Sequence, residues 1–239
     1  MSDRWGVNTW GSSMKRWGEV SWTPLDISDS IGGYPLDLAH ALPGDQTADL
    51  SASGSDGDLI NAPAYTTDRF SRANGAMEFN GINEYVDTNI LTGLSGSGDF
   101  SINIWVKGSV LNYCVSQSKA DPPAYASDFI IGGSSGSDVF WMRSVTLGNA
   151  GDKTSLQDGS WHMLTFIWDS VAETYEGFVD NASLGTSGVV TGYGGVSSIK
   201  IASRGDGTTA FVNGDLSDGW FWQRKLTASE RLSLFTEVY

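Results

Sequence analysis

The chain has 239 residues, which is enough for one large domain with a sizeable core. It carries 28 acidic against 14 basic residues, and its formal net charge of −14 makes nucleic acid and anionic membranes unfavourable partners. Apolar residues make up 40% of the chain, but none of their runs is long enough for a membrane span. The composition therefore excludes a disordered chain, a nucleic-acid-binding protein and a helical membrane protein.

The first 23 residues differ from the rest. Trp5, Trp10, Trp17 and Trp22 are separated by Gly and polar residues, and their spacing has neither the helical nor the strand period. We expect residues 1–23 to form an extended docking arm that buries these four rings on a partner. The alternative is that the arm folds back onto its own domain. The chain also begins without the apolar segment of a secretory signal, so we expect synthesis in the cytoplasm, followed by retention there or by exit through another route.

Strand signals begin after the arm. Asp, Gly and Ser dominate residues 24–76, where short apolar islands predict edge strands joined by loops. Asn80 and Gly81 separate the apolar segments 76–79 and 84–88, a pattern that predicts a two-residue β-hairpin. We therefore expect the two segments to pair with each other.

Stronger strands follow. Phe100, Ile102, Ile104 and Val106 alternate with more polar positions and predict a half-buried strand. Both alternating sets of residues 161–168 are largely apolar, so this strand should be central and covered on both faces. Further strands are expected at 111–116, 128–131, 139–145, 174–180, 197–202, 210–212 and 219–223. Regularly spaced strands with little helix predict a β-sandwich or barrel.

A short helix is expected at the end of the chain. Thr227-Ala-Ser-Glu230 has the form of a capping box, in which each side chain bonds the backbone of the other residue. Leu226, Leu232 and Phe235 are the apolar residues that would anchor this helix to the sandwich.

Six segments, taken in order, resemble the laminin-G-like, or concanavalin A-like, jelly-roll domain. They are 48–59, 76–87, 100–107, 158–166, 176–182 and 213–230. The resemblance implies an all-β fold, a two-sheet antiparallel jelly-roll sandwich with a short C-terminal helix behind the extended N-terminal arm. We expect the jelly roll to span residues 24–239. This fold serves many functions, so it does not by itself select one.

A second resemblance bears on function. The Trp-Gly repeats of residues 1–23 are similar to the leading segments of structural proteins of marine tailed phages. This implies a virion protein made in the host cytoplasm, a capsid decoration, tail fibre or spike subunit that docks on other capsid or tail components and forms a homo-oligomer. The alternative is a carbohydrate-binding module or adhesin that recognises host surface glycans. Its stacking platforms would be Tyr113, Tyr125, Trp141 and Tyr193.

Catalytic residues are not recognisable in the sequence. A nucleophilic triad needs a base beside Ser or Cys, but His162 lies in a strand and His40 in loop-like sequence, which we expect to be exposed. The strand motif Glu-x-Asp-x-x-Glu, which similar jelly-roll glucanases carry, is absent. Cys114 lies in an apolar segment and should be a buried thiol. We expect no enzymatic activity.

A calcium site is the one metal site that the sequence suggests. Members of the resembled family often bind calcium where the opening strand meets the closing strand, which corresponds here to Asp56 and Asp218. The alternative is that both aspartates only form turns. No other cofactor is expected.

Overall fold

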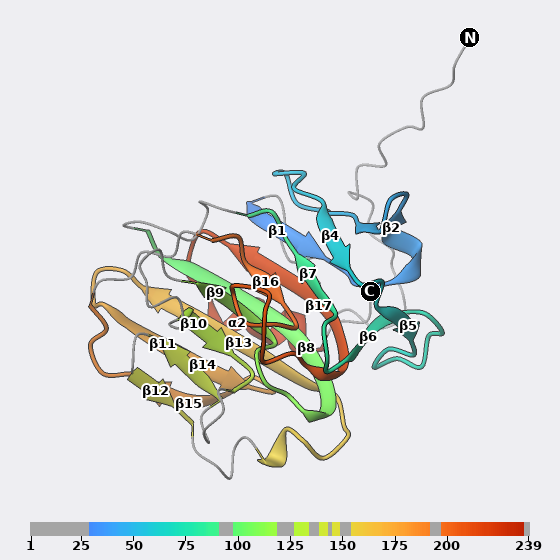
Figure 1. The fold of residues 1–239 in the computed structure, drawn as a ribbon. Helices are drawn as coiled ribbons and strands as arrows, with labels where there is room; N and C mark the ends of the chain where they lie inside the picture. The colour runs from blue at the N-terminus through green and yellow to red at the C-terminus, as the bar shows by residue number, and fades with distance from the viewer. Residues whose placement is uncertain are drawn as a thin grey trace, which may run out of the picture.

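The structure is a computed structural model, and it describes residues 29–90, 98–118, 127–133, 139–142, 145–148, 154–191 and 197–236. These residues form two antiparallel sheets that face each other (Figure 1), so the predicted all-β jelly-roll sandwich is confirmed. The arm at 1–23 lies outside the described residues, and the domain boundary after it stays a prediction. No helix in the described ranges is long and apolar enough to cross a membrane.

Sheet A has eight strands in the order β15-β14-β13-β8-β17-β6-β5, with β1 also paired to β17. Its strands are β1 (Ser30–Tyr34), β5 (Ala64–Thr66), β6 (Ala76–Asn80), β8 (Phe100–Val110), β13 (His162–Asp169), β14 (Thr174–Val179), β15 (Ala182–Thr186) and β17 (Asn213–Trp222).

Sheet B has nine strands in the order β12-β11-β10-β9-β16-β7-β4-β3-β2. They are β2 (Ala41–Leu42), β3 (Gln46–Thr47), β4 (Gly57–Ile60), β7 (Tyr85–Asp87), β9 (Val115–Ser118), β10 (Ser127–Ile131), β11 (Phe140–Met142), β12 (Val145–Leu147) and β16 (Lys200–Ile201). A short 3-10 helix, η1 (Leu38–His40), precedes β2.

The main core lies between the two sheets. On β13, Leu164, Phe166 and Trp168 point into this core, whereas Met163 and Ile167 belong to a second cluster on the other face of sheet A. β13 also pairs with β8 on one side and β14 on the other. The prediction of a central strand covered on both faces is confirmed.

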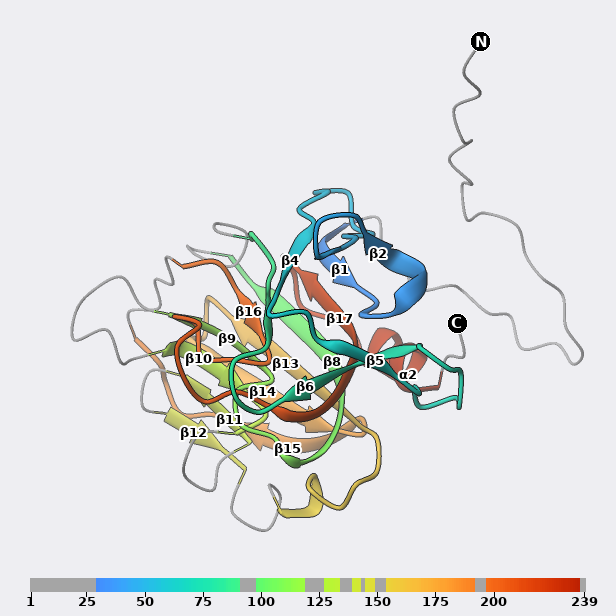
Figure 2. The ribbon, with the colours of Figure 1, turned by 45° about the vertical axis from the view of Figure 1, so that its right-hand side comes forward.

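The second cluster lies between sheet A and the C-terminal helix α2 (Ala228–Thr236). Leu226 and Leu234 pack there against Trp105, Trp220 and Trp222. Figure 2 shows α2 on one side of the molecule and strands β9, β10 and β16 of sheet B on the other. Because α2 covers the outer face of β8, the first residues of that strand are buried on both faces, and the prediction of a half-buried strand is wrong.

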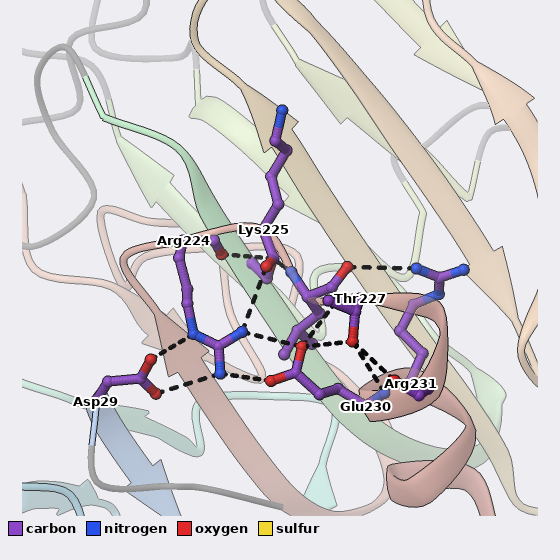
Figure 3. A network of polar contacts seen from close by, with 9 residues as sticks. Asp29, Arg224, Lys225, Thr227, Glu230 and Arg231 are labelled. Atoms are coloured by element: carbon purple, nitrogen blue, oxygen red, sulfur yellow. Dashed lines mark hydrogen bonds and ion pairs between the residues drawn. The ribbon is translucent and has the colours of Figure 1, made fainter.

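The capping box that begins α2 is confirmed. Glu230 Oε2 accepts a bond of 2.7 Å from Thr227 N, and Thr227 Oγ1 accepts one of 3.3 Å from Glu230 N. Arg224 joins Glu230 to Asp29, so the helix is tied to the segment that leads into β1 (Figure 3). Of the predicted anchors, Leu226 is buried and Phe235 stacks on a ring of sheet A, but Leu232 is 50% exposed.

The Asn80-Gly81 turn does not join paired strands, so the hairpin prediction is wrong. β6 ends at Asn80 in sheet A, and β7 begins at Tyr85 in sheet B, so the turn carries the chain from one sheet to the other. Gly81 does adopt the left-handed φ of +74° that the signal requires. The signal therefore reports local backbone geometry correctly but not strand pairing. The predicted strand at 210–212 is also wrong, because these residues belong to the loop before β17.

A bulge in β17 changes the partner of that strand. Residues up to Leu216 pair with β6, and residues from Gly219 onward pair with β1. Asp218 lies at the change of partner with a left-handed φ of +52°. The bulge thereby brings Asp218 next to the chain that follows β1, where Asp218 N donates to Pro35 O at 3.1 Å.

Candidate functional site

The outer face of sheet B carries a row of polar residues that crosses five neighbouring strands. The row consists of Gln46 on β3, Asp58 on β4, Asp87 on β7, Lys200 on β16 and Ser116 on β9, each paired with the next across the sheet. The sequence neighbours Leu59, Val86 and Ile201 belong to the core, so strand alternation places the row on the opposite face. We call these five residues the polar row.

Side-chain contacts hold the polar row in a fixed arrangement. Gln46 Nε2 donates to Asp58 Oδ1 at 2.7 Å, and Asn89 Nδ2 donates to Asp58 Oδ2 at 3.1 Å. Lys200 Nζ donates to the carboxylate of Asp87 on the neighbouring strand. Ser116 is fully buried and Lys200 is 8% exposed, so the groups that the row presents to solvent are the amide of Gln46 and the carboxylates of Asp58 and Asp87. Their contacts with one another and with Lys200 hold them in place.

Aromatic side chains border the polar row. Tyr85 lies two residues before Asp87 on β7, and the rings of Tyr85 and Phe211 are 6.3 Å apart. Lys200 Nζ lies 5.8 Å from the centre of the Tyr85 ring. Burial, followed by the charges of Asp87 and Asp206, raises the pKa of Tyr85, so its phenol stays protonated and able to donate. Both rings are partly exposed.

The two carboxylates of the row face each other, with Asp58 on β4 and Asp87 on β7. Hydrogen bonds from Gln46 and Asn89 lower the pKa of Asp58, and Asp87 is paired with Lys200. A general acid needs a raised pKa, and the bonds to Asp58 lower its pKa instead.

Neither histidine belongs to the polar row. His162 lies at the start of β13 between two carboxylates, with Nδ1 2.7 Å from Asp180 Oδ2 and Nε2 3.2 Å from Asp158 Oδ1. His162 is therefore hydrogen-bonded on both of its ring nitrogens. His40 ends η1, pairs with Asp37 at 2.7 Å and keeps 36% of its side chain exposed.

The native pKa of His162 predicts a pH-dependent stability. Burial lowers this pKa, but the bonds to Asp180 and Asp158 outweigh burial and raise it above the ordinary 6.5. The native state then binds the proton more tightly, so the stabilisation is complete below pH 6.5 and is lost as the pH rises through the native pKa. We expect His162→Gln to reduce the fall in unfolding free energy between pH 6.5 and higher pH, measured by urea titration. His40→Gln is the control. It removes a histidine whose pKa is also raised, and it leaves the contribution of His162 to the pH dependence in place. An unchanged pH profile in His162→Gln would contradict the assignment.

The structure gives the two predicted calcium ligands different surroundings. Asp56 Oδ1 accepts from Asp49 N at 3.0 Å, and Asn89 Nδ2 donates to the backbone oxygen of Asp56 at 3.0 Å. Asp218 keeps 16% of its side chain exposed and forms an ion pair with Arg69. Within the described ranges, no group of three Asp, Glu, His or Cys side chains has the arrangement of a metal site.

Calcium binding at Asp56 and Asp218 stays a proposal, and a chelator tests it. Calcium bound only to the native state would stabilise it, so EDTA should lower Tm, and added calcium should restore it. Asp56→Asn should abolish that shift. A Tm that does not respond to EDTA would leave both aspartates as turn residues.

The structure describes only some of the remaining residues that were singled out in the sequence. Tyr113 is half-buried beside Arg204 and Asp206, and burial raises its pKa. Trp141 lies on β11, where its backbone pairs with Ile130. Trp5, Trp10, Trp17, Trp22, Tyr125 and Tyr193 lie outside the described residues. Cys114 is buried, as expected.

Sequence reasoning missed the polar row. Asp58, Asp87 and Lys200 each stand next to an apolar residue in a short strand, which is the one signal that they face outward. That signal does not say which strands are neighbours, and β4, β7 and β16 come from distant parts of the chain.

A comparison with protein-family models gives one match. The model described as "Concanavalin A-like lectin/glucanases superfamily" matches residues 80–230, more than half of the chain. No curated protein matches.

Several solved structures of other proteins have a similar fold. A mutant Trypanosoma rangeli sialidase with trans-sialidase activity aligns at TM-score 0.61 and 14% identity, over 89% of this chain and 33% of that one. The binding domain of Paraclostridial Mosquitocidal Protein 1 aligns at TM-score 0.55 and 15% identity, over 87% of this chain and 52% of that one. Domain 4 of AbnA, a GH43 extracellular arabinanase from Geobacillus stearothermophilus, in complex with arabinotriose, aligns at TM-score 0.55 and 14% identity, over 87% of this chain and 99% of that one.

These identities show the fold alone. The chain spans about a third of the sialidase and about half of the mosquitocidal binding domain, but nearly the whole of the arabinanase domain.

Proposed function

Because the chain belongs to the concanavalin A-like lectin/glucanases superfamily, we propose that it is a non-catalytic carbohydrate-binding domain whose binding surface is the outer face of sheet B. The observation that carries this proposal is the polar row with Tyr85 at its border. A similar domain is described in complex with arabinotriose, which supports saccharides as the ligand class.

The groups of the row match the chemistry of a sugar. Hydroxyl groups both donate and accept, so carboxylates such as Asp58 accept from them, and the second N–H of Gln46 Nε2 or the ammonium of Lys200 donates to them. The apolar C–H face of a sugar ring packs on an aromatic ring, and Tyr85 offers one beside the row. Since these groups are already held by one another, little side-chain entropy is lost on binding.

The absence of catalysis is part of the proposal. Asp58 and Asp87 are the facing carboxylates of the surface. Bonds from Gln46 and Asn89 lower the pKa of Asp58, and Asp87 forms an ion pair with Lys200. A sugar that lies over them would be bound without a proton donor for its glycosidic oxygen. We expect no release of reducing sugar from polysaccharides by the purified chain.

A glycan array followed by calorimetric titration tests the binding surface. For a saccharide that binds the wild type, Lys200→Met and Asp87→Asn should each weaken the affinity at least about 10-fold, which corresponds to about 1.4 kcal/mol. Lys225→Met is the control for removal of a lysine charge, because Lys225 forms an ion pair with Asp169 on sheet A beside α2 and does not belong to the polar row. Equal losses in all three variants, or no bound glycan on the array, would contradict the proposal.

We also propose a more specific biological role, that of a virion protein. This proposal rests on the Trp-Gly repeats of residues 1–23. A capsid decoration, fibre or spike subunit that displays a sugar-binding jelly roll would combine both functions. Its proposed partners are other virion components, a further copy of the chain and host surface glycans.

A further inference from the structure

A polar depression is lined by residues 37–39 and 72–75, none of which belongs to the polar row. These segments stand next to β2 and β5 in the chain, which Figure 1 shows on one flank of the molecule. The volume of the depression is about 400 Å³, and one wall is residues 37–39 at the start of η1. The other wall is residues 72–75, in the loop that joins β5 to β6. The depression therefore lies between segments of both sheets.

The two walls are fixed to each other. Leu38 N donates to Asn74 O at 3.0 Å across the depression. The loop is built around Asp68, whose buried carboxylate accepts from Phe70 N at 2.9 Å and from Arg72 N at 2.8 Å. Gly75 lies so close to this carboxylate that a Cβ there would come within 2.6 Å of it. The depression is thus a formed feature and not a gap between two loosely placed loops.

Opposite charges face the depression from its two walls. Asp37 uses Oδ1 to bond His40 N at 2.9 Å and His40 Nδ1 at 2.7 Å, and in the described part of the chain no donor contacts its Oδ2. Burial raises the pKa of Asp37, but the bonds from His40 outweigh burial and lower it, so the carboxyl is ionised. On the other wall, Arg72 keeps 46% of its side chain exposed.

Apolar groups complete the lining. Leu38 is 49% exposed, and Ala39 and Ala73 lie beside it. A carboxylate, a guanidinium group, an amide at Asn74 and an exposed aliphatic face therefore converge on one small volume.

We propose that this depression is a second saccharide-binding site that takes one neutral pyranose residue through a vicinal pair of hydroxyl groups. The site takes its ligand class from the proposed function but does not use the polar row. One hydroxyl donates to Asp37 Oδ2, its neighbour accepts from Arg72, and the C–H face of the ring packs on Leu38.

Charge balance favours a neutral ligand. Asp37 and Arg72 offset each other, and Asp68 is the ion-pair partner of Arg72. A carboxylated sugar would bring a further negative charge beside Asp37 and Asp68, on a chain whose net charge is already −14. Two separate sites on one domain would also raise the avidity for a branched or repeating glycan without any new contact.

Amide chemical shifts of the full chain during titration with methyl glucopyranoside, methyl galactopyranoside and methyl mannopyranoside test the site. For at least one of the three, we expect concentration-dependent shifts at Leu38 and at residues 73–75. Asp37→Asn, which keeps a residue able to cap η1, and Ala73→Trp, which fills the depression, should each raise the apparent Kd for these shifts more than 10-fold. Ala172→Trp, at another exposed alanine, is the control and should leave them unchanged.

The same spectra separate this proposal from the binding surface on sheet B. Shifts confined to the polar row would overturn the second site and leave the proposed function intact. Shifts confined to the depression would support the second site and contradict the polar row. No shifts at either surface with any probe would overturn both, and tighter binding of methyl glucuronide than of the neutral probes would overturn the assignment to neutral sugars.

Discussion

Phe166→Ala is expected to lower the free energy of unfolding by about 3–5 kcal/mol. Phe166 lies at the middle of β13 and is fully buried between the two sheets. Its ring centre is 4.9 Å from that of Tyr175, 5.7 Å from Phe100, 6.0 Å from Phe129 and 6.2 Å from Phe140. These rings come from four other strands in both sheets, so no small movement of one strand can fill the space that alanine leaves.

Urea unfolding followed by tryptophan fluorescence measures this loss. Val171→Ala is the control, because Val171 is 92% exposed in the turn between β13 and β14 and its truncation should change the free energy by less than about 0.5 kcal/mol. A loss below about 1.5 kcal/mol in Phe166→Ala would mean that the two sheets can close over the cavity, and the rigid aromatic centre described here would be wrong.

The sequence predicts a strand or helix well when the residues of that element alone determine its structure and burial. The apolar residues on both faces of 161–168 predict a covered central strand, because a strand of that composition can bury its surface only between two layers. The capping box at Thr227 and Glu230 is equally local, since four consecutive residues contain every group that bonds.

Features that depend on which strands become neighbours are not predictable in this way. The Asn80-Gly81 signal gives the correct φ at Gly81 but the wrong pairing, since the next strand joins the other sheet. The polar row could not be predicted from the sequence for the same reason. Asp58, Asp87 and Lys200 become adjacent through two cross-strand pairings of segments far apart in the chain, and no local pattern encodes these pairings.

The ion pair between Arg69 and Asp218 is a further long-range contact of this kind. Asp218 is predicted as a calcium ligand by the family resemblance, which places calcium where the opening strand meets the closing strand. Sequence spacing could not show that Arg69, 149 residues away, places a guanidinium group on its carboxylate. Only 5% of the Arg69 side chain and 16% of the Asp218 side chain are exposed. A positive group therefore already stands where the predicted calcium ion would supply one.

Arg69→Met is expected to destabilise the fold at neutral pH by about 3–5 kcal/mol, because it leaves a buried carboxylate without its partner. Burial raises the pKa of Asp218, and Arg69 and then Arg72 are the groups that lower it. Removing Arg69 therefore raises this pKa further. The native variant then binds a proton more tightly than the unfolded chain, so its stability should increase as the pH falls through the raised native pKa.

The double variant Arg69→Met, Asp218→Asn separates charge from packing. Methionine keeps an apolar body between the rings of Phe70 and Trp105, which lie on the Arg69 guanidinium with centres 4.3 Å away. In the described part of the chain, no acceptor contacts Arg69 Nε or Nη2, so the wild type already bears the cost of burying these donors. Replacing both charges should consequently restore most of the stability lost in the single variant. Lys225→Met, which breaks an exposed pair with Asp169, should cost less than about 1 kcal/mol under the same conditions. If the double variant is as unstable as Arg69→Met, the loss comes from the packing of the guanidinium between the two rings, and the unpaired carboxylate is not its cause.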